Sequence, residues 1–224
     1  MDDDAGHGEG SGPQVAADRI VLASGSRYRA ELLTAEGIDV DVDPPDIEER
    51  ALDGRLPDVG PAGLAVELAR LKAQAVALRH PGRVILAADQ VGVLPDPAGT
   101  LLLTKQADEQ GAVDQLCAMS GTSHQLVNGV VVIGADAHLH EGIDIQVVTM
   151  RRFDEAEARG YVRRFRPFDT SGSYRIEDQE VMEAEAPGSG LVLAVRGEDP
   201  SGVVGLPMPL VRRLLRLSGG PSTV

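Results

Sequence analysis

The alternation of apolar and polar positions predicts an α/β chain with parallel-type units first and hairpins in the middle. The apolar run 20–23 predicts a strand, because Val and Ile favour extended backbone. A polar turn follows, with Ser26 as the N-cap of a helix that ends at Gly37. Residues 38–42 alternate strictly and predict an edge strand.

The rest of the chain divides into further helices, a buried strand and several hairpin strands. The continuous apolar run 83–91 predicts a strand that is buried on both faces, with Asp89 near its carboxyl end. The remaining predictions are helices from Pro61 through Leu78, over 107–119 and over 155–164 (capped by Asp154), a last helix opened by 203–207, a loop over 168–174, and strands over 93–94, 101–103, 124–133, 143–150, 181–182 and 191–195. This order predicts one α/β domain over 19–224 with two lobes around a cleft.

Composition restricts the partners of such a domain. The net charge of −14 disfavours nonspecific binding of nucleic acid, and 3% aromatic residues leave few platforms for base stacking. A polyanionic ligand would therefore need a local positive pocket, a metal ion, or both. Residues 1–18 are acidic and Gly-rich, and they predict a disordered tail.

Cysteine content and hydropathy restrict the kinds of site and the cellular compartment that we expect. The lone Cys117 excludes an intramolecular disulfide and a Cys-based zinc site. The sequence shows neither an apolar run long enough to span a membrane nor a secretory signal, so we expect a cytoplasmic protein. It also lacks a P-loop, a dinucleotide fingerprint, a His-Glu-x-x-His motif and a nucleophile elbow.

The turn 24–29 is the first candidate for chemistry. A strand–turn–helix aims free N–H groups and a positive helix end at one point, which suits a phosphate. Arg27 and Arg29 lie in the first helical turn, where cations oppose the helix dipole unless an anion lies between them. The alternative is a solvated basic turn.

Three other features admit a structural and a chemical interpretation. Four carboxylates within 43–49 are typical of a solvated loop, or of a site for a hard metal. Lys72 is expected at the border of an apolar helix face, where an ordinary surface lysine extends its ammonium to water. Asp89 in a buried strand costs stability unless it is paired, metal-bound or solvated.

Four short motifs, taken together, resemble the Maf nucleotide pyrophosphatase family: 22–29, 68–73, 88–91 and 203–207. The resemblance covers about residue 19 to 217. It implies a mixed α/β fold with an elongated central sheet and flanking helices, a homodimer, and metal-dependent hydrolysis of a nucleoside triphosphate to the monophosphate and pyrophosphate.

The resemblance also implies roles for individual residues. Asp89 looks like the catalytic acid–base residue, and Lys72 and Lys105 look like the two active-site lysines. Glu49 and Asp89 would hold a divalent cation, Mg or Mn. The phosphate-contacting turn is similar at Ser24, Ser26 and Arg29.

Three residues suggest which base the substrate carries. Tyr28, Gln90 and Glu177 are similar to the residues at these places in the 7-methyl-GTP branch of the Maf family. An aromatic ring can stack on a cationic methylated purine, and a carboxylate can accept from the N1–H and amino groups of guanine. The alternatives are hydrolysis of UTP and dTTP, and a non-catalytic nucleotide-binding regulator of septum formation and cell division. The chain differs from the family pattern at Arg27, around Lys105 and over 178–190.

Overall fold

A mixed seven-stranded sheet forms the centre of the computed structural model, which describes residues 19–97 and 99–219. Strand β1 pairs in parallel with β2 and β3, whereas the other pairings are antiparallel. The order is β2-β1-β3-β5-β6-β7, with β4 also paired to β3. The predicted tail 1–18 lies outside the described residues. The strands are β1 (Ile20–Leu22), β2 (Val40–Val42), β3 (Ile85–Asp96), β4 (Gly99–Leu103), β5 (Ser123–Ile133), β6 (Leu139–Met150) and β7 (Val192–Arg196).

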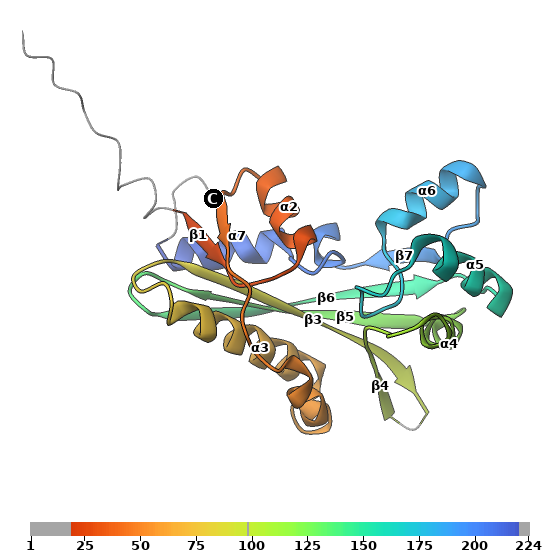
Figure 1. Cartoon of the computed structure of the whole chain (residues 1–224), viewed down its shortest axis with the longest axis horizontal. Coiled ribbons are helices and arrows are strands. Elements are labelled where there is room, and N and C mark those ends of the chain that lie inside the picture. Colours follow the sequence, from red (N-terminus) through yellow and green to blue (C-terminus); the bar gives the residue numbers. More distant parts are fainter. Residues whose placement is uncertain (1–18, 98, 220–224) are drawn as a thin grey trace, which may run out of the picture.

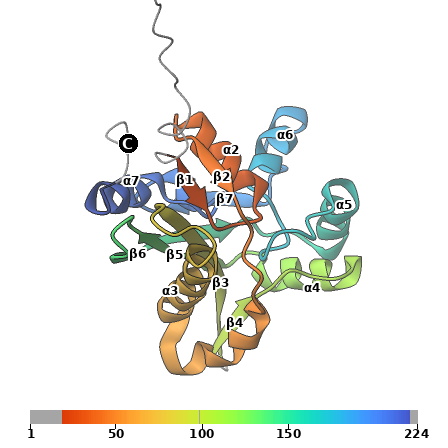
Figure 2. The same cartoon turned by 60° about the vertical axis from the view of Figure 1, so that its left-hand side comes forward.

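Helices cover both faces of this elongated sheet (Figures 1 and 2). Helix α3 lies on one face, α2 and α7 lie on the opposite face, and α4, α5 and α6 gather at the far end. This confirms the predicted mixed α/β fold. The helices are α2 (Arg27–Ala35), α3 (Leu56–Ala77), α4 (Glu109–Met119), α5 (Glu155–Phe165), α6 (Glu177–Glu185) and α7 (Met208–Leu217), with 3₁₀ segments η1 (Glu49–Arg55) and η2 (Pro200–Gly202). Among the described residues, none of these helices is long and apolar enough to cross a membrane.

Small and branched aliphatic side chains fill the core on both faces of β3. Ile85 and Ala87 pack in one cluster with Ala69 and Ala73 of α3. Leu86 and Ala88, which point to the other face, share a cluster with α7. This alternation follows from the two-residue period of a strand, and it lets β3 be buried on both sides as predicted.

Most predicted elements are confirmed, including the N-cap Ser26 and the capping box at Asp154. Three predictions need correction. Strand β3 continues to Asp96, so Asp89 lies in the middle of the strand and not near its end, because pairing with β4 and β5 extends it. Helix α3 already begins at Leu56, and a break at Gly60 (φ 68°) separates its first turn from the regular part opened by Pro61.

The third correction concerns 181–182, which belong to helix α6 and not to a strand. Acidic residues in the first turn of α6, among them Glu177 and Asp178, favour a helix N-terminus. The helix is attached to the sheet by Gln179, whose Oε1 accepts from the backbone N–H groups of Leu191 (2.6 Å) and Val192 (3.1 Å).

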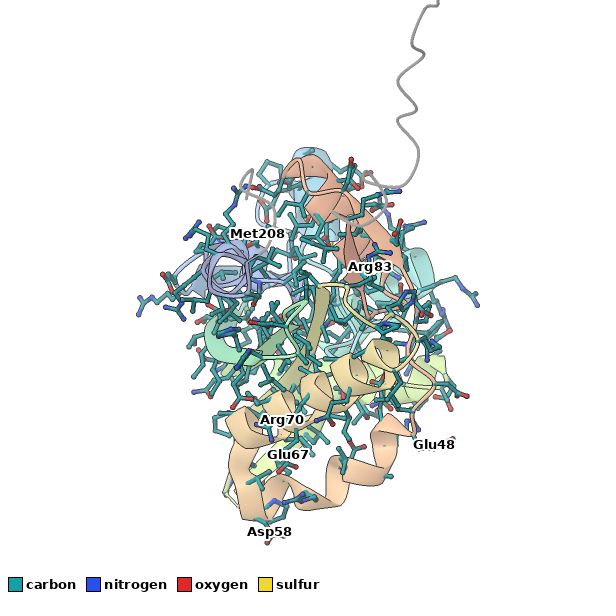
Figure 3. The ribbon with its side chains drawn as sticks, turned by 90° about the vertical axis from the view of Figure 1, so that its left-hand side faces the viewer. Glu48, Asp58, Glu67, Arg70, Arg83 and Met208 are labelled. Carbon is teal, nitrogen blue, oxygen red and sulfur yellow. The ribbon has the colours of Figure 1, made fainter. Side chains whose placement is uncertain are left out.

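Ion pairs attach α3 to its neighbours on the side seen in Figure 3. Arg70 contacts Glu141 of β6 at 2.7 Å, and Arg55 of η1 contacts Glu67 at 3.1 Å. Each partly exposed pair contributes only about 0–1 kcal/mol, so packing is what holds α3 in place.

Helix α3 approaches the sheet closely at Gly129 of β5. A Cβ there would lie 2.4 Å from the carbonyl carbon of Ala65 and 2.6 Å from the amide nitrogen of Val66. Gly129 is also the strand partner of Asp89. The missing side chain at position 129 therefore sets the distance between α3 and the strand that carries Asp89.

We expect Gly129→Ala to lower the free energy of unfolding by about 1–3 kcal/mol, because helix backbone must shift to admit the methyl group. The matched control is Gly160→Ala in α5, where a Cβ meets no atom within 4 Å. That change should raise stability by up to about 1 kcal/mol through helix propensity. Urea denaturation of both variants is the measurement, and equal effects would contradict the close approach.

Candidate functional site

The candidate site lies at a gap in the edge of the sheet. Strand β1 pairs with β3 at Ile85 and Leu86, and β4 pairs with β3 from Gly92 onward, so residues 87–91 fall between these two partners. A cleft of about 1240 Å³ opens here, walled by the turn 24–29, the loop leading to η1, α3, the end of β4 and the loop before α6. All ten residues singled out from the sequence line this cleft: Ser24, Ser26, Tyr28, Arg29, Glu49, Lys72, Asp89, Gln90, Lys105 and Glu177.

A buried ion cluster joins three of them. The Nζ of Lys72 donates to Asp89 Oδ1 at 2.5 Å and contacts Glu49 Oε2 at 3.0 Å. Lys72 is only 6% exposed, so the expectation of a lysine extending into water is wrong. Burying an ammonium is costly unless anions compensate it, and the two carboxylates do so. Glu49 remains half exposed at the mouth of the cleft.

Arg29 joins the turn, β3 and the loop 203–207. Its Nε donates to the carbonyl oxygen of Gly205 (2.9 Å), and its Nη1 donates to the carbonyl oxygen of Ala88 (2.7 Å) and to Ser24 Oγ (3.2 Å). Burial lowers the pKa of Arg29, while the carboxylates of Asp89 and Glu49 act in the opposite direction. The guanidinium is thus held in one position at the edge of the cleft.

The turn itself has the hydrogen bonds expected at a helix start. Ser26 Oγ accepts from the backbone N–H of Arg29 at 3.4 Å, and Ser24 Oγ accepts from the backbone N–H of Ser26 at 3.2 Å. Arg27 pairs with Glu31 at 3.3 Å on the outer side of α2. Of the two arginines in this turn, Arg29 is buried and Arg27 faces solvent.

The three residues suggested for the base differ in their surroundings. Tyr28 donates from its hydroxyl to Asp169 Oδ2 at 3.4 Å, with the Arg27 guanidinium 5.5 Å from its ring centroid. Glu177 is exposed at the N-terminus of α6. Gln90 is partly buried and uses its amide nitrogen within the protein. Lys105, just after β4, is exposed and lines the cleft.

Several lining residues had not been singled out from the sequence, notably Asp53, Asp169 and Arg175. Partial burial raises the pKa of the Asp53 carboxyl, and Asp89 and Glu49 add to this while Arg50 opposes it. Arg175 donates to Asp169, and both residues line the cleft. In the sequence, the only feature that could have indicated Asp53 is its position just after the acidic loop 43–49.

The donor set can be compared with the needs of a metal ion. The described residues contain no group of three or more His, Cys, Asp or Glu side chains that could hold one. Glu49 and Asp89 nevertheless bring two carboxylates to a single cation, the Lys72 ammonium. Mg²⁺ is commonly held by one or two carboxylates together with substrate phosphates, so these residues fit a metal that arrives with a phosphorylated ligand.

Behind one wall, a fully buried histidine supports Tyr174. The Nε2 of His124 lies 2.9 Å from the Tyr174 hydroxyl, and the two rings meet edge to face. Burial lowers the pKa of His124 to about 4, so the ring is neutral at pH 7. Tyr174 in turn lines the cleft.

Comparison with known protein families identifies the family of this chain. A family model described as Maf-like protein matches residues 19–218. The chain belongs to the Maf-like family. The four motifs that suggested this resemblance all contribute residues to the cleft, where Arg29, Lys72, Asp89 and Val203 come from segments far apart in the sequence.

Similar Maf-like relatives carry two different names. The chain is 40% identical over 208 residues to the dTTP/UTP pyrophosphatase of Deinococcus radiodurans, covering 92% of this chain and 96% of that protein. It is 35% identical over 201 residues to the 7-methyl-GTP pyrophosphatase of Xanthomonas oryzae pv. oryzae, covering 90% and 97%. Among solved structures, the Staphylococcus aureus Ham1 protein matches with a TM-score of 0.39 and 18% identity, over 59% of this chain and 71% of that one.

The buried histidine of this Maf-like chain predicts a pH effect on stability. The pKa of His124 is about 4 in the folded state and about 6.5 when unfolded, so the unfolded chain binds more protons between these values. Stability is therefore complete above pH 6.5 and falls as the pH drops toward 4, by about 3 kcal/mol in total. Urea midpoints between pH 7 and pH 4 measure this.

The contribution is isolated by His124→Gln, which does not titrate and keeps a hydrogen-bonding group near Tyr174. We expect this variant to have a flatter pH profile than the parent chain. The control His138→Gln changes an exposed histidine whose surface ion pair with Asp136 contributes little to stability, so the profile should stay close to that of the parent chain. Identical profiles for the parent chain and His124→Gln would contradict the assigned pKa.

Proposed function

We propose that this chain is a nucleoside triphosphate pyrophosphatase that hydrolyses its substrate to the monophosphate and pyrophosphate, with 7-methyl-GTP as the substrate. The observation that carries the proposal is the Lys72–Asp89–Glu49 cluster, which lies in the same cleft as the Arg29 turn. The names of the Maf-like relatives support the reaction class.

The reaction follows from the charges in the cleft. A water molecule attacks the α-phosphorus while Asp89 accepts its proton, and the bond to the oxygen that bridges the α and β phosphates breaks. Lys72 orients the Asp89 carboxylate by donating to its Oδ1. Arg29 and the N-terminus of α2 neutralise charge that spreads over the phosphates.

A divalent cation, Mg or Mn, belongs to this proposal. Glu49 and Asp89 would hold it, and it would supply charge neutralisation on the phosphate oxygens. The proposal also includes a cytoplasmic homodimer, as the family resemblance implies.

For the base, Tyr28 would stack on a cationic methylated purine, and Glu177 would accept hydrogen bonds from its Watson–Crick edge. The second candidate substrate is UTP or dTTP, which the 40% identity to a dTTP/UTP pyrophosphatase favours. Both candidates use the same phosphate chemistry; they differ in the base, and dTTP differs also in its sugar.

Replacing the proposed base tests the reaction. We expect Asp89→Asn to reduce pyrophosphate release at least about 100-fold, because an amide cannot accept the proton of the water. Asp89→Asn should still bind nucleotide, which is measured by calorimetry with a non-hydrolysable triphosphate analogue. The panel is 7-methyl-GTP, UTP, dTTP, CTP, GTP and ATP with Mg²⁺ or Mn²⁺.

The matched control is Asp53→Asn, a carboxylate of the same cleft outside the Lys72 cluster, which should lose less than about tenfold. Turnover that survives in Asp89→Asn would remove Asp89 from its role. Binding by the parent chain without release from any nucleotide would favour the regulator of cell division.

Substitution of Tyr28 tests the choice of base. Tyr28→Ala should lower the preference for 7-methyl-GTP over UTP by on the order of tenfold in kcat/KM, since base–aromatic stacking contributes about 1–3 kcal/mol. Tyr28→Phe keeps the ring, loses the contact with Asp169, and should retain the preference. An equal loss across all nucleotides in Tyr28→Ala would argue against stacking.

A further inference from the structure

A row of polar side chains crosses the sheet behind the cleft, on the face opposite Asp89. Gln90 of β3 is the strand partner of Asn128 of β5, and Asn128 is the partner of Asp144 of β6. Asn128 is fully buried, and Asp144 is 7% exposed. Gln146, two residues further along β6, is also fully buried. Buried polar groups of this kind must satisfy one another, so their hydrogen bonds have a defined direction.

The direction of these hydrogen bonds is set at Asp144, because a carboxylate can only accept hydrogen bonds. It accepts from Asn128 Nδ2 at 2.9 Å and from Gln146 Nε2 at 3.1 and 2.9 Å. The Asn128 amide is thereby oriented with its Oδ1 toward Gln90. Gln90 Nε2 donates to that oxygen at 3.1 Å.

The segment around η2 reinforces this arrangement. Gly202 O accepts from Asn128 Nδ2 at 2.8 Å and from Gln90 Nε2 at 3.0 Å, and Val203 O accepts from Gln90 Nε2 at 3.2 Å. A Cβ at Gly202 would lie 2.4 Å from Asp144 Oδ2, so η2 packs directly on the carboxylate. Every polar partner of the Gln90 nitrogen is therefore an acceptor within the protein.

We propose that Asp144 is a specificity-determining positioning residue: acting through Asn128, it holds the Gln90 nitrogen inside the protein and leaves Gln90 Oε1 as the group offered to the base. An acceptor at this place selects bases with a ring N–H on the Watson–Crick edge, such as guanine, uracil and thymine. Adenine and cytosine have an unprotonated ring nitrogen there and would meet oxygen lone pairs. This inference rests on the proposed function.

The names of the relatives fit this selection rule. Guanine carries N1–H, and uracil and thymine carry N3–H, so the nucleotides named for the two groups of relatives share the ring N–H. In this chain the Gln90 oxygen would accept from either kind of ring N–H, and other residues, such as Tyr28, would then separate purine from pyrimidine.

The test compares UTP with CTP, which have the same size and differ in the hydrogen-bonding pattern at N3 and C4. The parent chain should prefer UTP in kcat/KM and in Kd. Asp144→Asn has nearly the same shape, but its NH₂ can face Asn128, so the Asn128 amide loses the carboxylate that orients it. Gln90 Nε2 is then held only by the carbonyl oxygens of Gly202 and Val203. We expect the UTP-to-CTP ratio to fall about tenfold, the value of one hydrogen bond near the upper end of the usual range.

The control Asp39→Asn makes the same charge change at an exposed residue and should keep the parent ratio. A structural defect would lower activity on both nucleotides together, whereas a positioning role moves their ratio. Equal kcat/KM for UTP and CTP in the parent chain, or equal losses on both in Asp144→Asn, would overturn the inference and leave the pyrophosphatase proposal intact.

A second measurement does not depend on turnover. The side-chain NH₂ signals of Gln90 in ¹⁵N NMR spectra are assigned by their loss in Gln90→Glu. They should exchange with water more slowly than those of exposed glutamines in the parent chain, and faster in Asp144→Asn. Fast exchange in the parent chain would overturn the inference. If the chain binds nucleotides without releasing pyrophosphate, this NMR test still applies, and Kd values for UTP and CTP replace kcat/KM.

Discussion

The site depends on one ammonium group held between two carboxylates in the cleft. Lys72 is buried, and without Asp89 and Glu49 its charge would be expensive to keep there. The same argument applies to Asp89, which is also buried and has Lys72 as its partner. Each charge of the pair therefore requires the other, and the pair persists only because packing holds α3 against β3.

The sheet provides the place for this cluster. Since β1 leaves β3 after Leu86 and β4 joins it at Gly92, the intervening residues have a free edge that faces the cleft. Asp89 and Gln90 point to opposite faces from this edge, so phosphate chemistry and base recognition can be approached from two sides. Arg29 binds the exposed carbonyl of Ala88 and thereby attaches the first turn to the same edge.

Local sequence patterns predicted much of the fold, whereas most of the cleft residues were predicted through the resemblance to the Maf family. Apolar periodicity and caps located the main helices and hairpins, with Ser26 and Asp154 confirmed as caps. The prediction for 181–182 was wrong, because two apolar residues in a row do not distinguish a strand from one turn of a helix. Acidic residues at the start of α6 and its contact with β7 favour the helix.

What the sequence determined by itself was therefore local: which segments form strands and helices, and which polar residues stand out in apolar surroundings. Only the tertiary structure decided that Lys72 is buried and paired, that Asp53 lines the cleft, and that Asp144 lies behind Gln90. These facts depend on contacts between segments far apart in the chain. Helical or strand periodicity shows which face a residue occupies, but the charge or amide that meets it there comes from another element.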